Sequence, residues 1–347
     1  MQNETQNNLP LLQLKDLSIG IHEKGQTYTA VDSISYNVYP GEILGVVGES
    51  GCGKTVTNLA IMGLLPDVLF VKGGEILYRT GSGPDSPVID LAKCGPDVRR
   101  NLNGSAMSII YQEPMTSLNP LMKVGKQAGE ALRIHQKLPA EEIHKRVLEA
   151  FEDVGLPDPE GSARKYPHQL SGGQRQRVMI AMATLLNPRL LIADEPTTAL
   201  DVTIQAQVLA LLKRINREKN TAIIFISHDL AVIRQICDRV IVMYAGKIAE
   251  TGTTSDILER PVHPYTSGLI ASIPKASAKG QNLANIPGHV PSTQEQRLPC
   301  PFANRCVFAA LRCRTAAPKE YKLSDTHTCS CHYAVSFAAE YRNQDRR

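Results

Sequence analysis

The sequence predicts an α/β fold whose central β-sheet is parallel and carries polar residues at the carboxyl ends of its strands. Three short, largely apolar runs have the composition of buried parallel strands, at residues 42–47, 190–193 and 222–226. The first run leads into a glycine-rich loop and then into a stretch with helical periodicity at 54–65. Open sheets of this kind bind ligands at the carboxyl ends of their strands, so the residues that follow each run are candidates for function.

The glycine-rich loop has the spacing of a phosphate-binding loop. Its residues match the pattern G-x-x-x-x-G-K-T, namely Gly48, Glu49, Ser50, Gly51, Cys52, Gly53, Lys54 and Thr55. The glycines let backbone N–H groups turn toward the phosphates of a nucleotide, where a Cβ would obstruct them. Lys54 adds a positive charge for the β- and γ-phosphates, and the Thr55 hydroxyl can bind Mg²⁺. The loop and the helix N-terminus together predict a site for a nucleoside triphosphate.

The other two strands bring acidic and titratable groups to the same edge. Asp194 and Glu195 follow the second run, where Asp194 is expected to hold Mg²⁺ and Glu195 to polarise the attacking water. The alternative is an acidic pair that caps the next helix. His228 follows the third run and could contact a γ-phosphate, although a lone histidine is often a surface or capping residue. Gln112 follows a further apolar run, at 107–111.

A second glycine-containing motif precedes a helix predicted over 175–183. Its residues are Leu170, Ser171, Gly172, Gly173 and Gln174. Ser171 is a good N-cap, and a helix N-terminus favours a phosphate. The alternative is an ordinary capped helix start after a turn.

The order of these motifs resembles the nucleotide-binding subunit of ABC transporters, over residues of about 11–258. The resemblance implies a RecA-like core, an antiparallel β subdomain and a helical subdomain at about 121–188. It also implies a dimer in which Ser171, Gly172, Gly173 and Gln174 of one subunit close over ATP bound at Lys54 of the other.

The same resemblance assigns roles to further residues. Glu195 and His228 would support hydrolysis, and Gln112 would reach the Mg²⁺ and γ-phosphate and link them to a membrane partner. Asp201, which closely follows the acidic pair, would belong to the nucleotide site. Many relatives stack an aromatic ring on adenine, but the aligned position here is Ile21, so Tyr28 is the available substitute.

Length, composition and charge limit the classes of protein to consider. The chain has 347 residues and a nearly balanced net charge of +4, so no broad electrostatic argument for nucleic acid can be made. The aromatic content of 5% and the absence of Trp also argue against a base-stacking surface. No run of roughly 18 apolar residues occurs, and residues 1–6 are polar rather than a signal peptide, so we expect a cytoplasmic chain.

The remainder, residues 259–347, resembles the carboxyl-terminal extension of oligopeptide and dipeptide importer ATPases. The match is closest to the first of the two distinct ATPase chains of peptide importers. It implies an ATPase on the cytoplasmic face of the cell membrane, with two transmembrane permease subunits, a second cassette that is identical or a paralogue, and an extracytoplasmic substrate-binding protein. The branch also includes nickel and glutathione importers, so the solute stays open between peptides, glutathione and a metal chelate.

The extension also holds five of the eight cysteines, Cys300, Cys306, Cys313, Cys329 and Cys331. A reduced compartment disfavours disulfides, and a cluster of thiols there indicates a metal or an iron–sulfur cluster. The spacings differ from the paired knuckles of structural zinc sites. Some relatives carry a 4Fe–4S cluster, which by resemblance would use Cys300, Cys306, Cys313 and Cys331, with Cys329 as the alternative fourth ligand. The competing interpretation is a set of reduced structural thiols.

Two other classes of protein stay as alternatives. A soluble ABC protein of translation or DNA repair would normally bring two cassettes on one chain or a long coiled coil, and neither is visible in the sequence. A redox-sensing iron–sulfur ATPase is less favoured, because the residues expected to support hydrolysis are intact.

Overall fold

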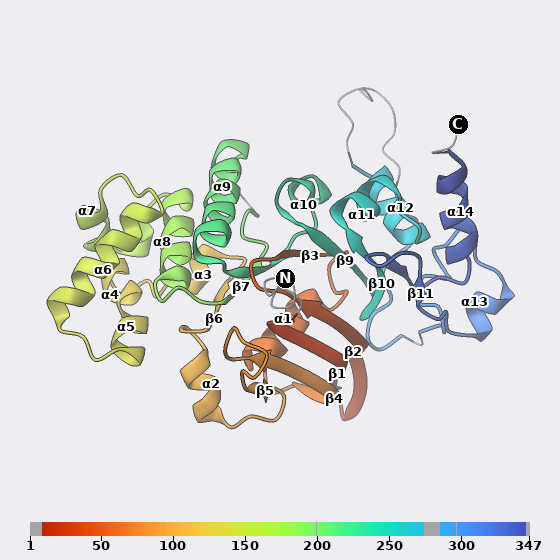
Figure 1. Cartoon of the computed structure of the whole chain (residues 1–347), viewed down its shortest axis with the longest axis horizontal. Coiled ribbons are helices and arrows are strands. Elements are labelled where there is room, and N and C mark those ends of the chain that lie inside the picture. The colour runs from red at the N-terminus through yellow and green to blue at the C-terminus, as the bar shows by residue number, and fades with distance from the viewer. Residues whose placement is uncertain (1–8, 199, 274–284, 296, 345–347) are drawn as a thin grey trace.

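The computed structural model describes residues 9–198, 200–273, 285–295 and 297–344. Residues 1–6, considered above for a signal peptide, lie outside the described residues. Figure 1 shows a central sheet with an antiparallel sheet beside it, a group of helices at one end and the carboxyl-terminal extension at the other. The α/β fold and the subdomains expected from the sequence are all present.

The central sheet has eight strands in the order β11-β12-β10-β9-β3-β8-β7-β6. Strands β6, β7, β8, β3 and β9 are parallel, and β10, β12 and β11 continue the sheet antiparallel. The bounds are β3 Ile43–Val47, β6 Met107–Ile110, β7 Leu190–Asp194, β8 Ala222–Ile226, β9 Arg239–Tyr244, β10 Lys247–Thr253, β11 Tyr321–Lys322 and β12 Thr328–Cys329. Every residue of β3, β7 and β8 is buried, which explains why these strands read as continuous apolar runs.

The antiparallel sheet has the order β2-β1-β4-β5. Its strands are β1 Leu12–Glu23, β2 Gln26–Val38, β4 Leu69–Arg79 and β5 Val88–Asp90. Its buried face shares one hydrophobic cluster with the central sheet and helix α1, which spans Lys54–Met62. The sequence predicted this helix to residue 65, but it ends earlier because Gly63 takes a left-handed conformation, with φ of 67°.

A helical subdomain follows β6 and includes α8, which returns the chain to the sheet (Figure 1). Its amphipathic α6 buries Ile143, Val147 and Phe151, which are spaced four residues apart along one face of the helix. Its helices are α3 Pro114–Ser117, α4 Val124–Ala128, α5 Glu130–His135, α6 Ala140–Asp153, α7 Pro159–Ala163 and α8 Gly172–Thr184, with a 3₁₀ turn at Pro167–Gln169. The remaining helices of the core are α2 Pro96–Leu102, α9 Val202–Lys219 and α10 Leu230–Ile236.

The extension is packed into the core rather than separated from it. Strand β12 pairs with β10 at the sheet edge, and the buried Glu250 carboxylate of β10 accepts hydrogen bonds from Val262 N–H, His263 N–H and His327 Nε2 at 2.7–2.9 Å. The helices in this part are α11 Thr254–Glu259, α12 Pro264–Ala271, α13 Leu311–Thr315 and α14 Ala334–Gln344. None of the helices in the described residues is long and apolar enough to cross a membrane.

Candidate nucleotide site

The glycine-rich loop connects β3 to α1, as the sequence predicts. Gly48 has a φ of 154°, and a Cβ at this position would lie 2.2 Å from the Met243 carbonyl oxygen, so the loop can pass the neighbouring strand only with glycine here. Helix α1 begins at Lys54, and its N-cap residue, Gly53, supplies no side-chain cap. The helix N-terminus therefore offers its amide groups and partial positive charge to an anion.

Lys54 lies inside the curve of the loop. Its Nζ donates to the carbonyl oxygens of Gly48 and Glu49 at 2.6 and 3.0 Å and lies 3.5 Å from Cys52 Sγ. Burial raises the pKa of the Cys52 thiol, and the side chain is fully buried, so it is a poor target for thiol reagents. Ser50, Gly51 and Thr55 are the exposed residues of the loop.

Asp194, the last residue of β7, lies beside the start of α1. The Thr55 side chain lies close enough to lower the pKa of its carboxylate, although α1 and β7 are far apart in the sequence. Burial is the main reason that the pKa of Asp194 is raised, and it outweighs the opposite effects of Thr55 and Lys54. A carboxylate and a hydroxyl held together next to a lysine are the kind of oxygen ligands that Mg²⁺ uses beside nucleotide phosphates.

The Glu195 carboxylate, which follows β7, is contacted by residues that follow the two neighbouring strands. Its Oε2 accepts a hydrogen bond from Gln112 Nε2 at 3.0 Å and from Thr198 Oγ1 at 2.9 Å, and lies 3.2 Å from His228 Nδ1. Glu195 also has a φ of 46°, which is uncommon for a residue with a side chain. Because β6, β7 and β8 are adjacent and parallel, the residues that follow them gather around one carboxylate.

The second motif lies in the helical subdomain. Ser171 caps α8: its Oγ accepts from Gln174 N–H at 3.3 Å, and Gln174 Oε1 accepts from Ser171 N–H at 3.0 Å. Gly172 has open space around it, whereas a Cβ on Gly173 would touch Ile204 of α9. Within one chain, the capped helix start weighed from the sequence is therefore what these four residues form, with Ser171 and Gly172 exposed.

Two residues assigned by resemblance have local roles in this structure. Asp201 is the N-cap of α9, where its Oδ1 accepts from Ile204 N–H at 2.9 Å. Its neighbour Ala199 lies outside the described residues. Tyr28 is half-buried in β2 directly opposite Ile21 of β1, so the two positions considered for adenine contact form one cross-strand pair. The Tyr28 hydroxyl donates to Gln26 Oε1 at 2.5 Å.

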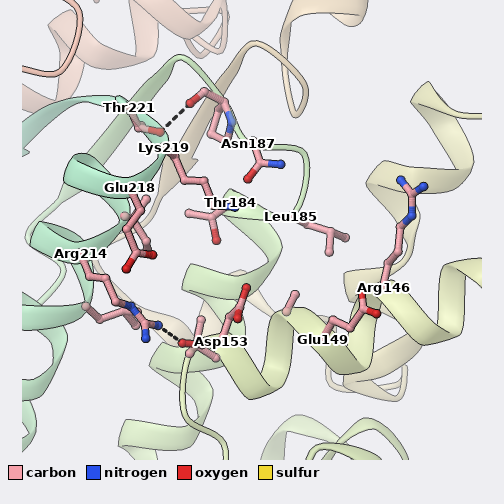
Figure 2. A pocket seen from close by; sticks show the side chains of 15 residues that line it. Arg146, Glu149, Asp153, Thr184, Leu185, Asn187, Arg214, Glu218, Lys219 and Thr221 are labelled. Atoms are coloured by element: carbon pink, nitrogen blue, oxygen red, sulfur yellow. Dashed lines mark hydrogen bonds between the residues drawn. The ribbon is translucent and has the colours of Figure 1, made fainter.

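A cavity of about 300 Å³ lies away from these residues, between α6, the end of α8 and α9. Figure 2 shows its lining, which includes charged side chains of both signs and in which Arg214 donates to the Asp153 carbonyl oxygen. None of its lining residues comes from the glycine-rich loop or from the strand ends described above. The cavity therefore lies at the junction between the helical subdomain and the core and is separate from the candidate nucleotide site.

Four cysteines of the extension, Cys300, Cys306, Cys313 and Cys331, affect one another's pKa values. Burial, with smaller contributions from Cys313, Cys331 and Cys306, raises the pKa of Cys300 to about 11. Cys329 is fully buried in β12, and among the cysteines only Cys331 affects its pKa. In the part of the chain that the structure describes, no group of three or more His, Cys, Asp or Glu side chains is arranged to hold a single metal ion.

Sequence reasoning missed three residues that contact the site. Thr198 hydrogen-bonds to Glu195, which lies only three residues before it in the sequence. The hydroxyl group of Thr198 is the feature of the sequence that could have indicated this contact. Tyr265 and Arg305 of the extension both contact Glu49 of the loop, from 216 and 256 residues away. No local pattern in a single sequence reveals contacts of that range.

Comparisons with known proteins show the family to which the chain belongs. Residues 31–198 match the ABC transporter family, and residues 249–313 match the carboxyl-terminal region of oligopeptide/dipeptide transporters. The dipeptide transport ATP-binding protein DppD of Bacillus subtilis is 45% identical, over 92% of this chain and 94% of the relative. DppD of Escherichia coli is 43% identical, over 95% and 98%.

A solved structure of an ATP-binding cassette, described as dimeric in a post-hydrolysis state and bound to ADP and Pi, superposes with a TM-score of 0.62. It is 26% identical and covers 70% of this chain and 98% of its own. The fold, the loop geometry and these similarities lead to one conclusion: the chain belongs to the ATP-binding ATPase subunits in the oligopeptide/dipeptide branch of the ABC transporter family.

Proposed function

We propose that the chain binds and hydrolyses ATP at the carboxyl edge of the central sheet and thereby drives import of di- or oligopeptides through partner permease subunits. The observation that carries the proposal is the convergence of Gln112, Glu195 and His228 next to Asp194 and the Lys54 loop. The peptide solute is supported by the match of residues 249–313 and by relatives that are named as dipeptide transport proteins.

Within this proposal, the loop residues Gly48 to Thr55 hold the phosphates of ATP through backbone N–H groups and the Lys54 ammonium. Thr55 and Asp194, with Gln112, would hold Mg²⁺, which neutralises charge on the phosphates. Glu195 orients the attacking water and accepts its proton. His228, which follows the neighbouring strand, contacts the γ-phosphate. Its Nδ1 lies 3.2 Å from the Glu195 carboxylate, so both side chains lie in the same part of the site.

The complete site is proposed to need a second cassette, either a copy of this chain or a paralogue. Ser171, Gly172, Gly173 and Gln174 would close over the nucleotide of that partner, with Asp201 nearby. The support is the exposure of Ser171 and Gly172 at a helix N-terminus and the dimeric state of the similar solved cassette. Tyr28 is the proposed contact for adenine, through its half-buried ring.

The proposed assembly lies on the cytoplasmic face of the cell membrane. It comprises two transmembrane permease subunits, two cassettes and an extracytoplasmic substrate-binding protein, with no nucleic-acid partner. Closure of the two cassettes around ATP would switch the permease from its inward-facing to its outward-facing conformation. Hydrolysis of ATP would then reopen the cassettes.

We also propose that Cys300, Cys306, Cys313 and Cys331 hold a 4Fe–4S cluster. The proposal is supported by the effects that these four cysteines have on one another's pKa values. The Tyr333 N–H donates to Cys331 Sγ at 3.4 Å, as suits a thiolate ligand. Each cysteine of such a cluster binds a different iron, so the sulfurs surround it rather than converge on one ion.

The catalytic proposal is tested with Glu195→Gln and Lys54→Ala in the full chain. Glu195→Gln should retain ATP binding, lose hydrolysis by about 10²-fold or more and accumulate as a closed dimer with ATP. Lys54→Ala should lose ATP binding itself. Full turnover by the Glu195 variant would refute the assignment of the base. Uptake of labelled dipeptide, glutathione and nickel chelate by the reconstituted transporter would then identify the solute.

The cluster is tested by anaerobic purification with iron, sulfide and zinc measured on one sample. About four irons and four sulfides per chain, lost in Cys306→Ser, are expected. A metal-free or zinc-loaded protein would refute the cluster and would mean that these cysteines have structural roles.

A further inference from the structure

The guanidinium of Arg305, in the extension, lies against the phosphate-binding loop. Its Nη1 and Nη2 donate to the two carboxylate oxygens of Glu49, at 2.5 and 3.0 Å. The Arg305 side chain is only 6% exposed, and that of Glu49 is 30% exposed. Two parallel charge-assisted hydrogen bonds fix both the distance and the orientation of the pair, which a single contact would not do.

Arg305 is itself held in place from behind. Its Nε donates to the Pro287 carbonyl oxygen at 2.8 Å, and Nη2 also donates to that of Ile286 at 3.2 Å. Nη1 lies 3.4 Å from the Tyr244 hydroxyl at the end of β9. The pair with Glu49 keeps Arg305 charged, with its pKa raised above its usual range. A guanidinium with this many partners is a rigid support for the loop rather than a mobile surface charge.

Tyr265 of α12 makes a second contact with the same loop residue. Its hydroxyl accepts a hydrogen bond from Glu49 N–H at 2.9 Å. The Tyr265 ring is fully buried and packs against the rings of Tyr244 and Phe302, with centroids 4.7 and 5.4 Å away. The hydroxyl is thus placed by packing and has little freedom to follow a moving loop.

These contacts fix Glu49 from three directions. Arg305 holds its carboxylate, Tyr265 its N–H, and Lys54 donates to its carbonyl oxygen. Glu49 immediately follows Gly48, where the loop leaves β3. A loop that is already held in one conformation loses less conformational freedom when it closes around phosphates, and its ligand then binds more tightly.

We infer that Arg305 and Tyr265 are positioning residues for the nucleotide: they hold the phosphate-binding loop in its binding conformation, which makes the carboxyl-terminal extension part of the support of the ATP site. This inference rests on the proposed binding of ATP by residues 48–55. It predicts that changes in the extension alter ATP affinity without removing any group that touches ATP.

The experiment measures ATP affinity of the purified full chain with a fluorescent ATP analogue, and KM and kcat by phosphate release. Arg305→Gln should weaken nucleotide binding about tenfold and raise KM accordingly, with kcat changed less than twofold. Arg305→Lys should give an intermediate loss, because it keeps the charge but not the two parallel hydrogen bonds. Arg314→Gln is the matched control, since Arg314 is an exposed arginine of the same segment that bonds to Asn304.

Two further variants separate positioning from folding. Tyr265→Phe keeps the buried ring and removes only the hydroxyl, so it should weaken binding about threefold to tenfold with an unchanged melting temperature. Glu49→Gln combined with Arg305→Gln should be no worse than either single variant, because the two groups act as a pair.

The outcomes distinguish this inference from the proposed function. If Lys54→Ala loses binding while both Arg305→Gln and Tyr265→Phe bind ATP like the unaltered chain, the inference is wrong and the proposed site stands. If Lys54→Ala binds ATP normally, the assignment of residues 48–55 fails first. Additive losses in the double variant would show that Arg305 and Glu49 act separately, which would also overturn the inference.

Discussion

The side-chain amide of Gln112 donates a 3.0 Å hydrogen bond to the Glu195 carboxylate, joining the ends of strands β6 and β7. His228, at the end of β8, lies 3.2 Å from the same oxygen. The group proposed to polarise water is therefore held by the two strands on either side of its own. A movement of the segment after β6 would directly change the position of the Glu195 carboxylate. This contact therefore couples the helical subdomain to hydrolysis.

His228→Ala should lower kcat about 10²-fold, because it removes a group proposed to contact the γ-phosphate and to orient Glu195. ATP affinity should change little, since the loop and Lys54 remain. Phosphate release and binding of a fluorescent nucleotide measure the two effects separately. His289→Ala, at an exposed position of the extension, is the matched control. Equal losses in binding and turnover would mean that His228 acts in nucleotide binding and not in the chemical step.

Thr198→Val should lower kcat about tenfold, because the Glu195 carboxylate loses the 2.9 Å hydrogen bond that helps to orient it. The conservative change Thr198→Ser keeps a hydroxyl and should retain most of the activity. Steady-state phosphate release on both variants provides the comparison. If serine and valine variants were equally slow, the methyl group rather than the hydroxyl would be what matters at this position.

The sequence was sufficient to predict three strands of the parallel sheet, β3, β7 and β8, and the polar groups that follow them. Residues 222–226 were predicted as a strand, and β8 has these bounds, because a fully buried parallel strand has no polar residue to interrupt it. The meeting of Gln112, Glu195 and His228 depends on the order in which strands pair. Strand order is decided by long-range packing, so a single sequence suggests a shared edge but not which residues become neighbours.

The extension was much less predictable from its residues. Strands β11 and β12 contain two residues each, too few to show any alternation. The buried Glu250, which binds His327 and two backbone N–H groups, lies in a stretch whose residue types do not reveal burial. The contact of Arg305 with Glu49 spans 256 residues and joins the extension to the phosphate-binding loop, so it follows only from the folded structure.

Asp194→Asn should increase the stability of the nucleotide-free chain at neutral pH and weaken MgATP binding more than tenfold. Burial raises the pKa of Asp194, which means that its ionised form is less favourable in the folded chain than in the unfolded chain. Its charge therefore opposes folding above that pKa, and removing the charge removes the cost. Urea unfolding at pH 7 and nucleotide titration with and without Mg²⁺ test the two parts. A less stable Asp194 variant would contradict the sign of this argument.

Folding stability should fall on acidification because of His263. Burial lowers the pKa of His263 from 6.5 to about 4, and the nearby Glu250 only partly opposes this effect. Between these two values the unfolded chain binds a proton at His263 and the folded chain does not, so stability is lost as the pH falls through this window. The difference of about 2.5 pKa units corresponds to about 3 kcal/mol at most.

His263→Asn should make the unfolding free energy less dependent on pH between 6.5 and 4, because Asn carries no proton in that range. Asn can also cap α12, where His263 Nδ1 now accepts from Tyr265 N–H at 3.1 Å, so the fold should be retained. Urea unfolding at a series of pH values gives the slope, and the exposed His289→Asn variant is the control. If the His263 and His289 variants had the same slope as the unaltered chain, His263 would not be the group whose protonation accompanies acid unfolding.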